Sequence, residues 1–202
     1  MAYYRKLKVS DDKNLRAYII GLALGDGNLS NPNGRAIRLR ITCDKKYPIL
    51  IDKIADSLQK LFPENKVALV ERESCVDVSV YSNYLEDLLG WKVGQGSKFK
   101  QNVSMPEWIK KDLEARTYCL RGLIETDGSI YYDRGYKMVI FSNIVESLAT
   151  DVYESFKLLG FKPHFYKIKQ GVEYNHAYSH KYQVRLSKNS EQFLDLVRPE
   201  KV

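Results

Sequence analysis

The sequence predicts an α+β protein built from two pseudo-symmetric halves. Three observations support this prediction. An apolar helical segment ending in Asp-Gly occurs twice, the copies lie 101 residues apart in one register, and a similar order of strands and helices follows each copy. Each half is expected to run αββαββα and to contain an antiparallel, saddle-shaped sheet. The two halves are expected to pack together through the repeated helices.

The first half begins with a basic lead-in at residues 1–11, followed by a helix over residues 14–25 that Asp11 or Asp12 can cap. Gly27 is expected in the left-handed conformation that often follows a helix, and a segment rich in turn-forming residues comes next. Alternating apolar residues then predict strands, and helical spacing predicts helices. The strands are at residues 35–42, 66–71 and 74–81, and the helices at 48–62 and 83–89.

The second half repeats this order. A short helix near residues 106–113 leads into it. The elements expected after that are a helix at 116–126, two strands within 129–141, a helix at 147–159, strands at 163–169 and 181–187, and a helix at 190–197. The expected division of the chain is therefore a first repeat with its N-terminal arm at residues 1–100, a linker at 101–115 and a second repeat at 116–202.

Composition points to a basic intracellular protein. The 202 residues include 32 Lys and Arg against 25 Asp and Glu, a net charge of +7, which favours a polyanionic partner such as nucleic acid. Three cysteines, well separated in sequence, argue against a disulfide framework. No apolar stretch approaches the roughly 20 residues that a membrane helix needs, and no signal peptide is evident. We expect no membrane partner, and a cytoplasmic location in a prokaryote or an organelle in a eukaryote.

The repeated segment carries the most specific chemical signal. Residues 19–27 read IIGLALGDG and residues 120–128 read LRGLIETDG. Small residues recur four positions apart, which lets two helix backbones approach closely. These helix-interface residues are Gly21 and Gly25 in the first copy, and Gly122 and Thr126 in the second.

Packing the two helices side by side would bring Asp26 and Asp127 together at their C-terminal ends. A carboxylate is disfavoured there by the helix dipole, and two neighbouring carboxylates repel each other. A divalent cation with a preference for oxygen ligands, such as Mg²⁺, would relieve both effects. Gly25 and Thr126, which precede the aspartates, are further candidate metal ligands. Two metals at such a site could activate water and stabilise the leaving oxygen of a phosphodiester.

The paired segments resemble the motifs of the LAGLIDADG homing endonucleases, in the single-chain form with two repeats. The resemblance implies that Asp26 and Asp127 bind the catalytic Mg²⁺, for which Mn²⁺ substitutes. It also implies a monomer that cuts both strands of a long double-stranded DNA target and leaves short 3′ overhangs. Its gene would be carried by a host intron or intein, and a free-standing or intron-encoded enzyme is favoured over an intein. Two departures stand out. Leu24 replaces an acidic residue that the second copy has as Glu125, and Arg121 replaces a small or apolar residue, so that flank of the second helix is expected to be solvated.

A weaker resemblance concerns Lys98, which precedes a Pro-containing helix as an active-site lysine does in the family. A lysine there could hold the attacking water or offset negative charge on the phosphate. Lys100 competes for this role.

Alternating polar residues on the strands predict a surface that reads DNA, with Arg and Gln contacting base edges and Lys contacting phosphates. The candidates are Arg35, Arg38, Arg40, Arg72, Asp77, Ser79, Tyr81, Lys137, Lys167, Lys169, Gln183, Arg185 and Lys188. Two alternative functions share the fold, namely an intron RNA maturase and a DNA-binding regulator without catalytic activity. Retention of both aspartates favours the endonuclease.

Overall fold

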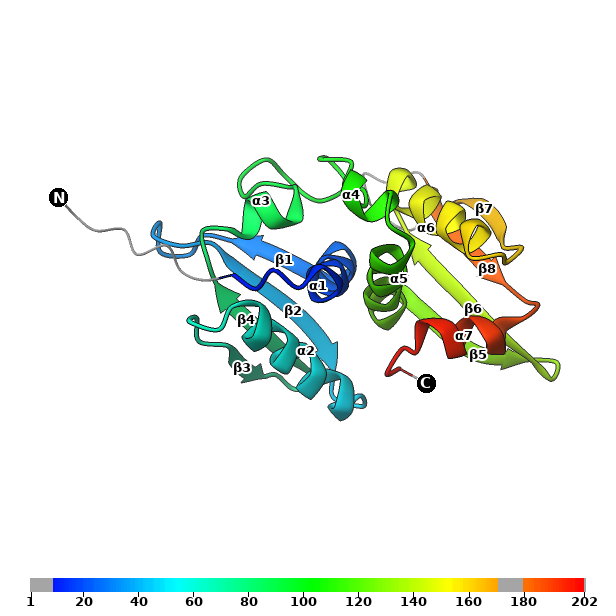
Figure 1. Cartoon of the computed structure of the whole chain (residues 1–202), viewed down its shortest axis with the longest axis horizontal. Helices are drawn as coiled ribbons and strands as arrows, with labels where there is room; N and C mark the ends of the chain where they lie inside the picture. The colour runs from blue at the N-terminus through cyan, green and yellow to red at the C-terminus, as the bar shows by residue number, and fades with distance from the viewer. Residues whose placement is uncertain (1–8, 171–179, 202) are drawn as a thin grey trace.

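A computed structural model describes residues 9–170 and 180–201, and it shows the two halves side by side (Figure 1). The first eight residues of the expected N-terminal arm lie outside the described part. The first half contains seven elements in the predicted αββαββα order. They are α1 (Lys13–Asp26), β1 (Gly27–Ser30), β2 (Arg38–Asp44), α2 (Pro48–Leu61), β3 (Ala68–Glu71), β4 (Cys75–Tyr81) and α3 (Leu85–Leu89).

The second half repeats this order after the short linker helix α4 (Glu107–Lys110). Its elements are α5 (Leu113–Asp127), β5 (Gly128–Asp133), β6 (Tyr136–Asn143), α6 (Glu146–Leu158), β7 (His164–Lys169), β8 (His180–Leu186) and α7 (Ser190–Val197). The predicted α+β fold with two αββαββα halves is therefore confirmed.

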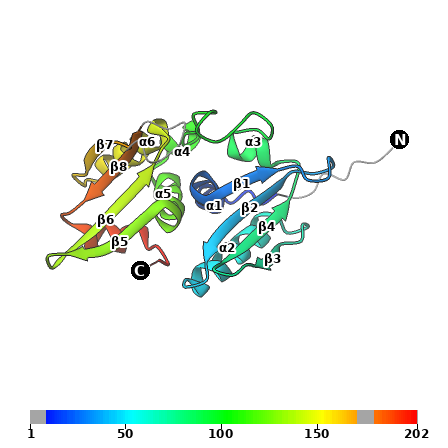
Figure 2. The ribbon, with the colours of Figure 1, turned by 180° about the vertical axis from the view of Figure 1, so that it is seen from behind.

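Each half forms one four-stranded antiparallel sheet. The strand orders are β1-β2-β4-β3 and β5-β6-β8-β7, so the two sheets have the same topology. Helices cover one face of each sheet, and the other face is free of helices when the molecule is seen from behind (Figure 2). The alternation predicted for β2 is present, because Leu39 and Ile41 are fully buried whereas Arg38 and Arg40 are only partly buried.

The helices α1 and α5 lie next to each other at the centre of the molecule (Figure 1). Their approach leaves no room for side chains at two glycines. A Cβ atom on Gly21 would lie 2.1 Å from the carbonyl oxygen of Cys119, and one on Gly122 would lie 2.5 Å from the carbonyl oxygen of Tyr18. A Cβ on Gly25 would meet the Thr126 side chain at 1.9 Å. The small residues of both copies therefore form the interface between the halves.

The N-terminal end of α1 agrees with the sequence prediction, whereas its C-terminal end differs from it. Asp12 is the N-cap, and its carboxylate accepts a hydrogen bond from the Leu15 amide at 3.0 Å. Gly27 is extended, with φ −73° and ψ 142°, so the expectation of a left-handed residue is wrong. The chain passes directly from α1 into β1, and a Cβ on Gly27 would lie 2.4 Å from the Ala23 carbonyl oxygen. Glycine is needed here because the backbone is crowded.

The first half contains one strand, β1, that was not expected from the sequence. The turn-forming residues after Gly27 led to the expectation of a turn, yet β1 occupies Gly27–Ser30. Its pairing with β2, from Gly27 with Ile41 to Ser30 with Arg38, overrides the weak strand preference of the segment. In the part of the chain that the structure describes, no helix is long and apolar enough to cross a membrane.

Substituting Gly21 with alanine tests the close contact between α1 and α5. Alanine favours helix formation over glycine, but its methyl group would overlap the Cys119 carbonyl. We expect Gly21→Ala to lower the free energy of unfolding in urea by about 1–3 kcal/mol or more, as overpacked cores do. Thr150→Ala, at an exposed position of α6, is the matched control and should be neutral or stabilising. Equal stability of Gly21→Ala and wild type would contradict the contact.

Candidate active site

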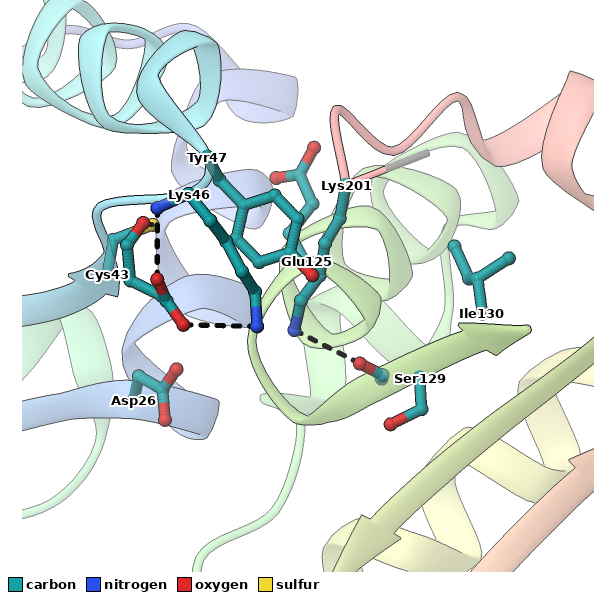
Figure 3. Close-up of a pocket in the computed structure, with 10 residues that line it drawn as sticks. Asp26, Cys43, Lys46, Tyr47, Glu125, Ser129, Ile130 and Lys201 are labelled. Atoms are coloured by element: carbon teal, nitrogen blue, oxygen red, sulfur yellow. Dashed lines mark hydrogen bonds and ion pairs between the residues drawn. The ribbon is translucent and has the colours of Figure 1, made fainter. Parts of the chain in front are cut away.

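The C-terminal ends of α1 and α5 place Asp26 and Asp127 near each other, as the repeat predicts. Each aspartate is the last residue of its helix, and their charges are close enough to interact. A cavity of about 320 Å³ opens beside Asp26 and is also lined by Lys46, Glu125 and Lys201 (Figure 3). Asp26 therefore lies at a hollow lined by residues of both halves, and Asp127 lies near Asp26 without lining this hollow.

Asp127 is the more perturbed of the two acids. Burial, reinforced by the charge of Asp26, raises its pKa to about 6. Asn143, on β6, donates a hydrogen bond of 2.6 Å to the carboxylate and works in the opposite direction. At neutral pH the Asp127 carboxylate is thus ionised in a poorly solvated setting, where its charge is expensive to maintain.

Asp26 has a raised pKa as well. The side chain reaches solvent at the cavity, but the surrounding protein displaces much of its hydration, and this desolvation is the largest cause. The ammonium groups of Lys98 and Lys201 partly offset the effect. Both neighbouring ammonium groups therefore favour the ionised form of Asp26.

Lys98 lies against the end of α1 as the sequence indicates. Its ammonium donates to the carbonyl oxygens of Ala23 and Leu24, at 3.2 and 2.8 Å, and to that of Gly25. A cation is favoured at a helix C-terminus, where carbonyl groups lack helical partners. Burial lowers the pKa of Lys98, and the charges of Asp127 and Asp26 raise it. Lys100 is exposed and has no such contact with α1, so the structure distinguishes the two candidates.

Lys201 occupies the corresponding place at the end of α5, and sequence reasoning missed it. Its ammonium donates to the carbonyl oxygens of Thr126 and Gly128, at 3.0 and 3.1 Å. Burial lowers its pKa, while Asp26 and Asp127 raise it. The repeat contained the signal, because Lys98 follows Asp26 by 72 residues and Lys201 follows Asp127 by 74.

The two carboxylates can hold a divalent cation. Within residues 9–170 and 180–201, no three His, Cys, Asp or Glu side chains lie close enough to form a metal site by themselves. The donor set would therefore combine Asp26 and Asp127 with water or phosphate oxygens. The carbonyls of Gly25 and Thr126, predicted as further ligands, accept hydrogen bonds from Lys98 and Lys201. Two desolvated, mutually repelling carboxylates fit a hard cation, which would relieve both costs.

The open face of the first sheet contains several of the predicted polar residues. Arg38 pairs with Tyr81 and Arg40 pairs with Ser79, so these four share the face opposite the helices. Arg35 is exposed in the loop before β2. The face thus offers arginines and a tyrosine to a ligand.

Asp77 lies on the same face but is enclosed by its neighbours. It is 6% exposed and accepts hydrogen bonds from Thr42 Oγ1 at 2.8 Å and from Arg72 Nε at 3.1 Å. Arg40 approaches it at 3.9 Å. The carboxylate therefore holds arginines in place and is not itself presented, and Ser79 is also buried beneath this layer.

In the second sheet, the residues predicted to contact DNA do not all lie on the same face. Gln183 and Arg185 alternate with the buried residues Tyr182 and Val184, so they lie on the open face. Lys167 pairs with Tyr182, and its ammonium lies 3.9 Å from Glu146 on α6. The expectation that Lys167 shares the open face is wrong, because the register turns it toward the helices.

The same register applies to two other lysines. Lys169 lies two residues beyond Lys167 on β7 and has the same orientation. Lys137 pairs with Tyr132 and is two residues from the fully buried Val139, which also places it on the helix-bearing side. Lys188 is exposed in the turn between β8 and α7.

Both open faces have an arginine at the same level. Arg40 pairs with Ser79, and Arg185 pairs with Ile140. These pairs lie at equivalent heights, because Gly27 pairs with Ile41 and Gly128 with Phe141. The arginine comes from β2 in one half and from β8 in the other.

The raised pKa of Asp127 makes an expected pH dependence testable. A carboxyl with a pKa near 6 in the folded state and an ordinary value when unfolded binds more protons when folded. Its contribution to stability is therefore lost as pH rises from about 4 to 6. Without added metal, Asp127→Asn should become more stable relative to wild type over this interval, and the difference should level off above pH 6.

Thermal unfolding at a series of pH values measures this difference. Asp56→Asn, on the exposed side of α2, is the control and should differ from wild type by the same amount throughout. A constant difference for Asp127→Asn would mean that Asp127 has an ordinary pKa.

Comparison with known proteins supports the family resemblance seen in the sequence. The family model described as LAGLIDADG-like domain matches residues 114–198. The structure of mesophilic variants of the homing endonuclease I-DmoI has a TM-score of 0.66 at 19% identity, covering 92% of this chain and 95% of that one. I-DmoI in complex with DNA and Mn gives the same score and identity, over 96% of its chain.

A further similar structure is the N-terminal LAGLIDADG domain of DUF199/WhiA, with a TM-score of 0.60 at 10% identity, covering 95% of this chain and 86% of that one. No curated protein matches the sequence. Residues 114–198 match the LAGLIDADG-like domain model, and the chain has the single-chain, two-repeat LAGLIDADG fold that the resemblance in the sequence implied.

Proposed function

We propose that this protein is a site-specific DNA endonuclease that hydrolyses both strands of a long, asymmetric double-stranded target and leaves short 3′ overhangs. The observation that carries the proposal is the pair of desolvated aspartates at the ends of α1 and α5, each helix end also holding a lysine. Structures of I-DmoI with target DNA, and with Mg, Mn or Ca, support this assignment for the fold.

The open faces of the two sheets are the proposed DNA-binding surface. They place Arg38, Arg40 and Tyr81 in one half and Gln183 and Arg185 in the other away from the helices. Arginine and glutamine can contact base edges in the major groove. The net charge of +7 favours association with the phosphate backbone. Since one chain supplies both faces, we propose that it acts as a monomer.

Asp26 and Asp127 are the proposed ligands of Mg²⁺, for which Mn²⁺ would substitute. A bound divalent cation would supply Lewis acidity to the attacking water and to the phosphate. Asn143 orients the Asp127 carboxylate through its 2.6 Å hydrogen bond. The carbonyls of Gly25 and Thr126 bring additional negative partial charge to the same place.

Lys98 and Lys201 are proposed to offset negative charge on the phosphate. Both ammonium groups already lie among carbonyl oxygens, so they are held at the helix ends before substrate binds. A preorganised cation stabilises developing charge without reorganising at the moment of reaction. Burial lowers the pKa of both amines, so each loses its proton more readily than an exposed lysine does.

An intron RNA maturase and a catalytically silent DNA-binding regulator are the two other functions proposed for this fold. Neither requires desolvated carboxylates beside two lysines. The endonuclease explains this costly arrangement, because a metal-dependent reaction uses both the acids and the cations. An endonuclease of this kind would be encoded in a host intron.

Substitution of the two aspartates tests the proposal directly. Asp26→Asn and Asp127→Asn should each abolish Mg²⁺-dependent cleavage of the DNA site selected from a library by the wild-type protein. Each variant should keep its affinity for that DNA, since neither change touches the sheet faces. Cleavage is followed by sequencing the product ends, and affinity by gel shift in Ca²⁺.

Asp56→Asn is the control for these variants and should cut at the wild-type rate. Full activity of either aspartate variant would overturn the assignment of the metal ligands. Tight binding without cleavage by the wild-type protein, in Mg²⁺ and in Mn²⁺, would favour the regulator, and preferential binding of intron RNA would favour the maturase.

The positions of the arginines and lysines on the sheets predict different effects on DNA affinity. Arg40→Ala and Arg185→Ala should each weaken specific binding by about 1–3 kcal/mol if the side chain contacts a base edge. Lys167→Ala should leave affinity within error of wild type, because Lys167 faces α6. Equal losses in all three variants, measured at one salt concentration, would contradict the proposed surface.

A further inference from the structure

A buried network lies behind the cavity, between α1 and α5. Glu125 is only 2% exposed, which is unusual for a charged residue at a contact between two helices. Its Oε2 accepts a hydrogen bond from the Tyr18 hydroxyl at 2.6 Å, so the network joins the two repeats. A carboxylate buried this deeply is costly without cationic and hydrogen-bonding partners. The other groups that bond to the Glu125 carboxylate belong to Arg121 and to the segment after α7.

Arg121 is not solvated, contrary to the sequence expectation. Its side chain is 18% exposed, and Nε lies 3.3 Å from Glu125 Oε1. A second guanidinium nitrogen donates to Glu200 Oε1 at 2.9 Å. An arginine at this motif position therefore connects the buried acid to a residue 79 positions later in the chain.

Glu200 is held by groups from both repeats. Its backbone amide donates to Glu125 Oε1 at 2.8 Å. Its own Oε1 accepts from Arg121 on α5 and, at 2.5 Å, from Lys53 on α2. Ion pairs at the surface contribute little individually, but this carboxylate is shared by two cations that approach from opposite halves. The result is a fixed backbone position at residue 200.

The next residue is Lys201, whose ammonium lies at the end of α5. Lysine side chains have many rotamers, and fixing one costs conformational entropy. Because the backbone is anchored at Glu200, the position of the neighbouring Lys201 Cα is restricted. Besides its two carbonyl acceptors, the ammonium lies 5.5 Å from the Tyr47 ring centroid (Figure 3). The Lys201 side chain therefore extends into the site from a backbone position that is fixed.

We propose that Glu200 is a positioning residue that holds Lys201 in the active site, with Arg121, Glu125 and Lys53 as its anchor. The proposal rests on the proposed endonuclease function for the role of Lys201, but the positioning itself is a property of the folded protein. The anchor has no counterpart in the first repeat, because Leu24 stands where the second repeat has Glu125. Loss of Glu200 should therefore disturb Lys201 and leave Lys98 unchanged.

Chemical labelling tests the positioning without requiring activity. The folded protein is treated briefly with acetic anhydride, and acetylation of Lys201 and Lys98 is measured by mass spectrometry. Glu200→Ala should accelerate labelling of Lys201 and leave that of Lys98 unchanged. Glu200→Gln keeps an acceptor oxygen and should give an intermediate rate. Glu154→Gln, which removes a carboxylate paired with Lys157 on the exposed surface of α6, should match wild type.

Single-turnover cleavage of the selected DNA site, with each strand labelled separately, tests the consequence. We expect Glu200→Ala to slow cleavage by about 10- to 100-fold, the range found when a supporting partner of a metal site is removed. The two strands should be affected unequally, because only one of the two lysines is disturbed. DNA affinity and the thermal midpoint should stay close to wild type, and Glu200→Gln should recover part of the rate.

The outcomes separate the two proposals. Unchanged labelling of Lys201 in Glu200→Ala overturns the positioning role, whatever the cleavage rates are. Faster labelling together with wild-type cleavage of both strands overturns the part of the proposal in which the position of Lys201 matters for cleavage, while the positioning by Glu200 stands. Faster labelling with slower, strand-unequal cleavage supports it. If wild-type protein cuts no DNA, the endonuclease proposal fails, and the labelling result alone decides whether Glu200 positions Lys201.

Discussion

The contact between α1 and α5 at Gly21 and Gly122 is the constraint on which the molecule depends. The backbones approach so closely that a methyl group would overlap a carbonyl oxygen. This contact sets where both helices end, and therefore where Asp26 and Asp127 meet. Each helix passes directly into the first strand of its sheet, so the same contact also sets how the two open faces are placed. The positions of the proposed DNA-binding surface and of the candidate active site therefore both follow from the packing of α1 on α5.

Electrostatics at the helix ends follow from this geometry. Desolvation raises the pKa of both acids at the helix ends, and the charge of Asp26 raises that of Asp127 further. The negative end of a helix also disfavours a carboxylate. Lys98 and Lys201 compensate by donating to the same terminal carbonyls. The arrangement keeps two acids and two ammonium groups close together at the helix ends.

Sequence alone was sufficient for several local patterns. The motif copies located Asp26 and Asp127, and alternation located β2 and β4, because both depend on neighbouring residues. It was insufficient wherever distant segments decide the outcome. Lys167 faces the helices because of how β7 pairs with β8. Lys201 and Glu200 reach α5 from 73 to 79 residues away, which also explains why Arg121 is enclosed when its sequence position indicated solvent.

The arginines of the open faces are placed unequally. Arg40 lies on β2 in one half, while its level in the other half is filled by Arg185 on β8. In a symmetric dimer any substitution appears twice and alters both faces together. Here the two faces are encoded by separate stretches of one gene, so each can change while the other is preserved. For the proposed DNA-binding surface, this means that the preferred DNA could shift one half at a time, with the contacts of the other half kept at each step.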